Sequence, residues 1–251
     1  MSVPSASRSG RRIVVALDGP ASSGKSTVGA AAARQLGLRF LDTGLLYRAL
    51  TWLALERGVD PAAPDAATAI VALVPAIALA PDPDGRLAHV IVDGIEVGEA
   101  LRSAAIDARV SEVARLPEVR AALLDAQRDL ARDGGIVMAG RDIGTVVLPD
   151  ADLKLYLDAS AEERARRRWE ERGLRAGDPA ADEVLAELRR RDGLDAGRAT
   201  APLRIAPDAT LLVSDGLERK ETIARVVAAI RAAEARIAAA TDAQAPDGVR
   251  R

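Results

Sequence analysis

The 251-residue chain contains no cysteine and a single histidine, His89, and these two absences exclude several kinds of chemistry. Without cysteine there is no disulfide framework, no thiolate metal site and no cysteine nucleophile. One histidine is too few for a metal site built from several histidines. The side chains left for chemistry are arginines, acids, hydroxyls and very few lysines.

Aromatic residues and long apolar runs are also scarce. Only five side chains are aromatic although 49% of the residues are hydrophobic, so the core must be built from Ala, Leu, Val and Ile. The longest uncharged stretch, 66–81, contains Pro75 and is shorter than the roughly 20 residues that span a bilayer. The apolar run after residue 12 is too short for a signal peptide. We therefore expect a cytoplasmic protein with a flexible N-terminus (1–12) and a disordered tail (240–251).

Neither sign of charge is in excess, because 35 basic residues face 37 acidic ones. The whole-chain charge of −2 gives no reason to expect nucleic acid or an anionic membrane as a partner. Three of the basic residues are lysines, Lys25, Lys154 and Lys220, and the rest are arginines. Any site for an anion must therefore be local.

Short β-type runs alternate with helical patterns along the chain. This alternation predicts an α/β fold with a parallel sheet and helices on both faces. We expect strands at 13–17, 40–41, 135–139, 153–157 and 209–213. Helices are expected at 27–36, 45–56, 99–114, 118–132, 161–172, 181–191 and 218–239. Several prolines and the β-rich residues 89–92 predict a small inserted β subdomain at 60–98.

The first strand leads into a phosphate-binding loop that fits the pattern G-x-x-x-x-G-K-[ST]. Glycines let backbone N–H groups surround phosphate oxygens, and the following helix N-terminus favours negative charge. Lys25 is expected to reach the β- and γ-phosphates and Ser26 to ligate Mg²⁺. The residues expected to bind ATP are Gly19, Pro20, Ala21, Ser22, Ser23, Gly24, Lys25, Ser26 and Thr27.

A second feature is the segment 161–204, which contains 11 arginines and 10 acids. Arg166, Arg167, Arg189 and Arg190 are interpreted as solvated helix residues with ion pairs one turn apart. Other arginines lie near glycine-containing hinges, as a closing lid requires. If the acceptor is a phosphate, its oxygen is already ionised near pH 7, and no histidine or cysteine is needed as a base.

Several separated motifs together resemble the bacterial cytidylate kinases, within the nucleoside monophosphate kinases. They are LDTGLLYR (41–48), PEVR (117–120), GRDIGT (140–145), SAEER (160–164) and RDGLDAGR (191–198) followed by Ala201-Pro202. The resemblance runs from about residue 13 to 235. It implies a P-loop core (13–59, 133–160 and 205–239), an acceptor-binding domain (60–132) and a short helical lid with flanking helices (161–204).

The resemblance also implies roles for individual residues. The acceptor phosphate would be held by Arg48, Arg141 and Arg191, the cytosine ring read by Ser111, Arg120 and Asp142, and the sugar contacted by Asp195 and Arg198. Thr43 and Tyr47 complete the expected acceptor site. Lys25, Arg141 and Arg191 are the expected catalytic residues, and Ser26 the expected metal ligand.

The expected reaction is transfer of the γ-phosphate of ATP to CMP, and to dCMP, with Mg²⁺, by a monomeric enzyme. Three alternatives stay open at this point. One is another P-loop kinase acting on UMP, AMP or a non-nucleotide such as shikimate. Another is a P-loop switch protein, against which the lack of a clear guanine-reading motif argues. The third is an inactive descendant.

Overall fold

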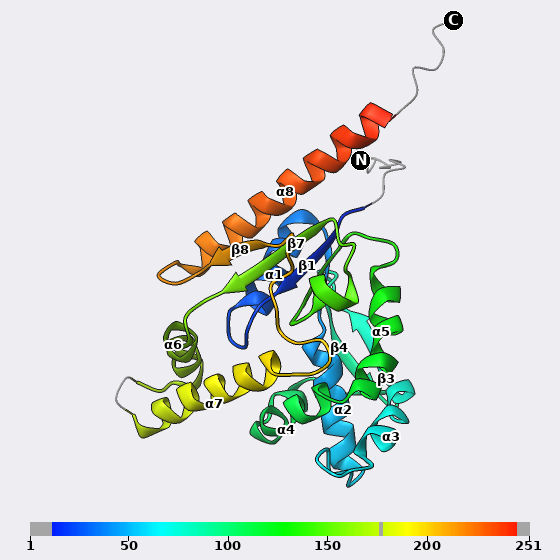
Figure 1. Cartoon of the computed structure of the whole chain (residues 1–251), viewed down its shortest axis with the longest axis vertical. Coiled ribbons are helices and arrows are strands. Elements are labelled where there is room, and N and C mark those ends of the chain that lie inside the picture. The colour runs from blue at the N-terminus through cyan, green and yellow to red at the C-terminus, as the bar shows by residue number, and fades with distance from the viewer. Residues whose placement is uncertain (1–11, 176–177, 245–251) are drawn as a thin grey trace, which may run out of the picture.

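A five-stranded parallel sheet forms the centre of the computed structural model, which describes residues 12–175 and 178–244 (Figure 1). Its spatial order is β2-β6-β1-β7-β8. The strands are β1 (Val14–Asp18), β2 (Arg39–Asp42), β6 (Ile136–Gly140), β7 (Leu153–Asp158) and β8 (Thr210–Val213). All five strands expected from the sequence are present, and the α/β fold class is confirmed.

Helices cover both faces of this sheet. α1 (Lys25–Leu36) and α8 (Arg219–Gln244) pack against each other and share a core with Val15 and Leu17 of β1. Ala16, between those two, belongs to a core on the opposite face, with α5 (Pro117–Ala131) and the π-helical turn η3 (Ile143–Val147). Successive strand residues point to opposite faces, which is why the central strands are apolar throughout.

The residues between β2 and β6 form a second body of structure. Its helices are α2 (Gly44–Glu56), α3 (Ala66–Val71), η1 (Val74–Ala76), η2 (Glu99–Arg102), α4 (Ala104–Ala114) and α5. Its strands β3 (Ile77–Pro81), β4 (Leu87–Val92) and β5 (Ile95–Glu96) form an antiparallel sheet. The expected β insert at 60–98 is formed by these three strands within 77–96, whereas residues 60–76 contain α3 and η1. Pro75 lies in the first turn of η1, where a missing N–H breaks no helical hydrogen bond.

Two helices, α6 (Ala161–Arg172) and α7 (Pro179–Ala196), pack against each other beside this second body (Figure 1). The helix expected at 181–191 corresponds to α7. Its expected end at residue 191 is wrong, because α7 continues through Gly193 for another turn. Glycine in a helix costs roughly 1 kcal/mol relative to alanine. Two aspartates in that turn offset this cost, since Asp192 pairs with Arg164 at 2.7 Å and Asp195 with Arg141 at 2.9 Å.

The C-terminal helix α8 is longer than expected. It runs to Gln244, so the expectation of a disordered tail from residue 240 is wrong for 240–244. The rest of that tail, 245–251, and residues 1–11 of the expected N-terminal segment lie outside the described residues. Among the described residues, no helix combines the length and apolar character needed to cross a membrane.

Candidate functional site

The phosphate-binding loop joins β1 to α1 and requires glycine at both of its ends. A Cβ atom on Gly19 would lie 2.2 Å from the carbonyl oxygen of Leu157. Gly24 has a φ of 91°, a left-handed conformation that other residues rarely adopt. Gly24 is also the N-cap of α1, so the loop ends at the N-terminus of this helix. Free N–H groups and the helix dipole attract an anion there.

Lys25 is held inside this loop. Its side chain is buried, and Nζ donates a hydrogen bond to the carbonyl oxygen of Pro20 at 2.9 Å. Burial and the nearby guanidinium of Arg141 lower the pKa of Lys25 well below its usual value. Arg191 lowers this pKa further, whereas Asp42 and Asp195 raise it. The loop lysine thus lies close to arginines that the sequence assigned to the acceptor.

Ser26 and Asp42 place two oxygen ligands side by side. The Ser26 hydroxyl donates to Oδ2 of Asp42 at 2.5 Å, while Oδ1 accepts from the backbone N–H of Gly44 at 3.0 Å. Within the described residues, no group of three or more acidic or histidine side chains could enclose a metal ion. Mg²⁺ in phosphoryl-transfer sites uses few protein ligands and takes the others from phosphates and water. This pair fits such an ion, although Asp42 was not among the metal ligands expected from the sequence.

A cavity of about 60 Å³ lies beside the loop and brings together every residue expected to bind the acceptor. Its lining includes Thr43, Tyr47, Arg48, Ser111, Arg120, Arg141, Asp142, Arg191, Asp195 and Arg198. Ligand pockets usually exceed about 300 Å³. Within this lining, Arg120 pairs with Asp142 and Arg141 pairs with Asp195.

One buried pair of the cavity is Arg120 with Asp142, joined by a hydrogen bond between Nη2 and Oδ2. Arg120 comes from α5, whereas Asp142 follows β6. The guanidinium also donates to the carbonyl oxygen of Ala114 at 3.1 Å and stacks over the Tyr47 ring, 5.5 Å from its centre. The pair combines a planar donor fork with a carboxylate acceptor, as recognition of a base edge requires.

Three other arginines, Arg48, Arg141 and Arg191, line the same cavity from α2, the β6 end and α7. Burial lowers the pKa of Arg191 to about 10, and the guanidiniums of Arg141 and Arg48 contribute to this shift. In the described part of the chain, Nε of Arg191 is buried without a hydrogen-bond partner. Cations that repel one another around an unused donor form a site for an anion.

A second pair joins Arg141 to Asp195. Nε of Arg141 donates to Oδ2 of Asp195 at 2.9 Å, and Arg198 donates to the backbone oxygens of Asp195 and Ala114 at 3.2 and 3.3 Å. Burial works against the charged form of Asp195, but Arg141 and Arg198 outweigh it and hold the pKa of Asp195 below its ordinary value. Asp195 therefore stays ionised next to the cavity.

Asp18, at the end of β1, holds the turn that follows Asp142. Its carboxylate accepts the backbone N–H groups of Ile143 at 2.8 Å and Gly144 at 2.7 Å. Burial raises the pKa of Asp18 to about 6, although these hydrogen bonds act in the opposite direction. Sequence reasoning did not assign Asp18 a function, because its partners lie 125 residues away.

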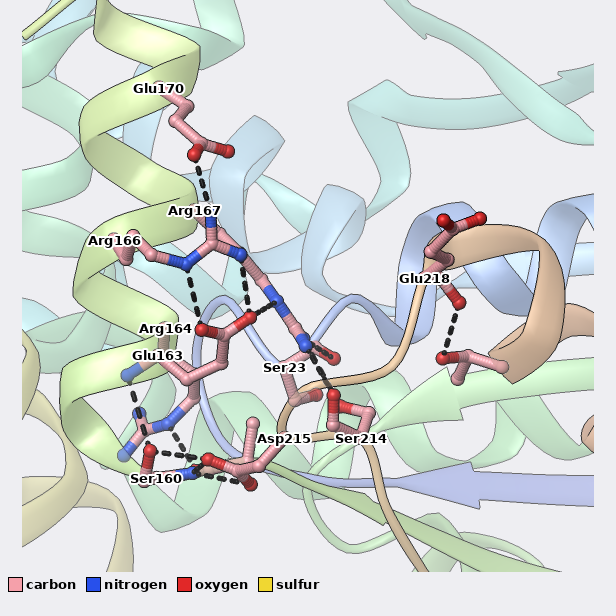
Figure 2. A network of polar contacts seen from close by, with 12 residues as sticks. Ser23, Ser160, Glu163, Arg164, Arg166, Arg167, Glu170, Ser214, Asp215 and Glu218 are labelled. Carbon is pink, nitrogen blue, oxygen red and sulfur yellow. Dashed lines mark hydrogen bonds and ion pairs between the residues drawn. The ribbon is translucent and has the colours of Figure 1, made fainter.

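Figure 2 shows how α6 reaches the phosphate-binding loop. Arg164 donates to the carbonyl oxygen of Ala21 at 3.1 Å, and Arg167 donates to that of Ser23 at 3.2 Å and that of Ser214 at 2.7 Å. Arg167 forms the expected ion pair one turn away, with Glu163 at 2.9 Å, but its contacts with the loop show that the interpretation as a solvated residue is wrong. Arg166 does fit that interpretation, since it is half-exposed and pairs with Glu163 and Glu170 on its own helix.

A family model and individual related proteins both indicate the same family. A family model described as "Cytidylate kinase" matches residues 15–232. A cytidylate kinase of Rhodococcus opacus (strain B4) is 49% identical over 219 residues, 86% of this chain and 93% of that protein. A cytidylate kinase of Geobacillus kaustophilus (strain HTA426) is 45% identical, over 86% of this chain and 96% of that protein.

Some relatives are longer. A bifunctional pantoate ligase/cytidylate kinase of Synechococcus sp. (strain RCC307) is 44% identical over 87% of this chain, which spans only 42% of that protein. The match to this relative therefore covers less than half of its length.

Proposed function

The chain belongs to the cytidylate kinase family, and from this premise we propose how its residues transfer the γ-phosphate of ATP to CMP. The observation that carries the proposal is the convergence of ten expected acceptor residues on one cavity next to the phosphate-binding loop. The five arginines of the cavity lining outnumber its two aspartates, which gives the net positive charge that favours binding of an anion.

The donor side of the reaction is the loop 19–27. Its backbone and the N-terminus of α1 would bind the ATP phosphates, and Lys25 would exchange its bond to Pro20 for one to the β- and γ-phosphates. Ser26 and Asp42 would hold Mg²⁺. A bound Mg²⁺ supplies charge neutralisation on the phosphate oxygens.

The acceptor side places the CMP phosphate among Arg48, Arg141 and Arg191. An ionised oxygen of that phosphate attacks the γ-phosphorus, the bond from the γ-phosphorus to the β-bridging oxygen breaks, and CDP and ADP result. Because the attacking oxygen is already ionised near pH 7, no side chain has to accept a proton. The residues of the site orient the two phosphates and compensate their charge.

Base selection would come from Arg120 and Asp142. The Asp142 carboxylate accepts from the amino group of cytosine, and Arg120 donates to the ring acceptors. We further propose that dCMP is also an acceptor, with Asp195 and Arg198 at the sugar.

A coupled assay with CMP, dCMP, UMP and AMP tests this assignment. We expect kcat/KM for CMP and dCMP to exceed that for UMP and AMP by at least about fivefold, because an unpaired buried polar group costs roughly 1–3 kcal/mol. Comparable rates with UMP would overturn the base-reading roles of Asp142 and Arg120.

Arg191→Lys tests the phosphate-binding role in the same assay. A lysine keeps the charge but cannot form the planar fork that matches a phosphate. We expect kcat to fall and KM for CMP to rise together. Unchanged kinetics would remove Arg191 from the proposed acceptor site.

A further inference from the structure

A carboxylate outside the cavity lining, that of Asp107, is shared by arginines from three helices. Asp107 lies in the first turn of α4 and is buried, with 8% of its surface exposed. Its Oδ1 accepts from Arg48 of α2 at 2.6 Å, and its Oδ2 accepts from Arg168 of α6 at 2.9 Å. Arg191 of α7 lies 4.0 Å from Oδ1.

Two of these arginines line the cavity and the third does not. Arg48 uses both terminal nitrogens to hold its position, one on Asp107 and the other on the carbonyl oxygen of Leu101 at 2.9 Å. Arg168 donates to Glu171 on its own helix and to Asp107 on α4. The bond from Arg168 therefore ties α6 to the side of the molecule formed by α2 and α4.

We propose that Asp107 is a positioning residue with two roles. Through Arg168 it holds α6, and with it α7, against α2 and α4, a connection called the latch below. It also orients Arg48 and Arg191 for the acceptor phosphate. The inference rests on the proposed function for the role of those two arginines. The connection between α6 and α4 through Arg168 and Asp107 does not depend on the proposed function.

The physical basis is the balance of charge in this cluster. The carboxylate of Asp107 is shared by three guanidiniums that come from separate helices. If Asp107 is neutralised, Arg48, Arg168 and Arg191 lose the one carboxylate that they share, while Arg168 keeps only Glu171 of its own helix and Arg191 keeps the nearby Asp195. The repulsion among the three guanidiniums then moves α6 and α7 away from α4. If only Arg168 is lost, Arg48 and Arg191 keep the carboxylate and α6 loses its tie to α4.

The kinetic test uses Arg168→Gln, with Arg168→Lys and Arg166→Gln beside it. Arg168 gives Asp107 a single hydrogen bond, so a lysine can replace it, whereas glutamine cannot supply the charge. We expect Arg168→Gln to raise KM for CMP about fivefold or more with a smaller change in kcat. Arg168→Lys should restore most of the affinity. Arg166→Gln, which removes ion pairs within the same helix, should leave the kinetics unchanged.

A double-mutant cycle with Asp107→Asn tests whether Arg168 acts through Asp107. In the Asp107→Asn background, Arg168→Gln should change KM by no more than about twofold. An equal effect in both backgrounds would overturn the link between the two residues. So would Arg168→Gln kinetics that match those of Arg166→Gln.

The latch is tested without catalysis by a distance measurement. Because the chain has no cysteine, Ala69→Cys on α3 and Ala186→Cys on α7 give two exposed spin-label sites and no others. Pulsed electron paramagnetic resonance on the nucleotide-free protein should show a longer or broader distance distribution for Arg168→Gln, and an unchanged one for Arg168→Lys. An unchanged distribution for Arg168→Gln would overturn the latch even if CMP kinase activity and the proposed acceptor site stand.

Discussion

At the scale of single residues, the site depends on charges that are buried before any nucleotide binds. Lys25, Arg120, Asp142, Asp195 and Arg198 all lie in surroundings largely closed to solvent. Most of them are compensated by one another, and the lowered pKa values of Lys25 and Arg191 indicate incomplete compensation. ATP and CMP supply the missing negative charge.

Lys25→Met should reduce kcat on the order of a hundredfold or more, because it removes a preorganised charge from the β- and γ-phosphates. The side chain keeps its length and the buried position suits methionine, so thermal unfolding should change little. Lys220→Met is the control, since Lys220 is exposed and pairs with Glu218. Near-normal CDP formation by Lys25→Met would contradict the assignment of the loop.

Asp142→Ala should lower kcat/KM for CMP strongly and bring the CMP-to-UMP ratio closer to one. The carboxylate attracts the amino group of cytosine and repels the carbonyl oxygen that uracil has in its place, so both effects disappear together. Measurement of kcat/KM with CMP and with UMP tests whether this ratio changes. Equal losses on CMP and UMP would mean that Asp142 acts on the phosphate or on the geometry of the loop.

Asp18 should make folding stability depend on pH in an unusual direction. Its folded-state pKa, about 6, lies above the usual value of 3.8, so the folded chain binds this proton more readily than the unfolded chain. Acidification from pH 7 toward pH 4 therefore favours folding through this group, by up to about 3 kcal/mol. Urea unfolding of the wild type and of Asp18→Asn gives the difference between their free energies of unfolding at each pH. The contributions of the other acidic residues are the same in both proteins and cancel in this difference. We expect the wild type to gain stability relative to the variant between pH 7 and 5, and a constant difference would contradict the raised pKa.

At the scale of elements, the strands could be predicted from the sequence because each contains a short, largely apolar run between turn signals. The end of α7 could not, because Gly193 looks like a helix breaker and the compensating partners of Asp192 and Asp195 are remote in sequence. The helices in 60–76 were missed because prolines were interpreted as breaks. Pro75 lies in a first turn, where it is tolerated.

Partners that are remote in sequence also limited what could be predicted about the site. P-loop residues follow a local spacing rule and were identified from it. The contacts of Asp42, Asp107 and Arg167 could not be predicted, because their partners come from other elements. The position of Asp42 at the carboxyl end of a parallel strand is a sequence signal that could have identified it.

Two helical glycines should respond in opposite ways to alanine. A Cβ on Gly193 of α7 would meet no atom of the described structure within 4 Å, so Gly193→Ala should stabilise the fold by about 0.5–1 kcal/mol. A Cβ on Gly29 of α1 would lie 2.6 Å from Cε2 of Phe40, so Gly29→Ala should destabilise it by about 1–3 kcal/mol. Urea unfolding of both variants checks the signs. Destabilisation by Gly193→Ala would contradict the continuous α7 helix.

At the scale of the whole molecule, the acceptor cavity is made by parts that are far apart in the chain: α2, α4 and α5, the β6 end, and α7. A ligand that binds there joins these parts. Binding should therefore stabilise the molecule as a unit.

CMP should raise the thermal midpoint, whereas cytidine, which lacks the phosphate, should not. A ligand at a hundredfold excess over its Kd adds about 2.7 kcal/mol, which corresponds to roughly 5–10 °C for a protein of this size. Arg191→Lys should reduce the shift with CMP. Equal shifts with cytidine would contradict a site that depends on the phosphate.

The strand order also determines the sequence of events by which the protein can be assembled. β6 lies between β2 and β1, so the first two strands cannot join one sheet until residues 136–140 have been synthesised and inserted. The 93 residues between β2 and β6 (43–135) form a loop whose closure costs entropy. Apolar clusters that join α2, α3, α4 and α5 draw the two ends of this loop together. A nascent chain that stops before β6 therefore has a phosphate-binding sequence but no sheet on which to build the site.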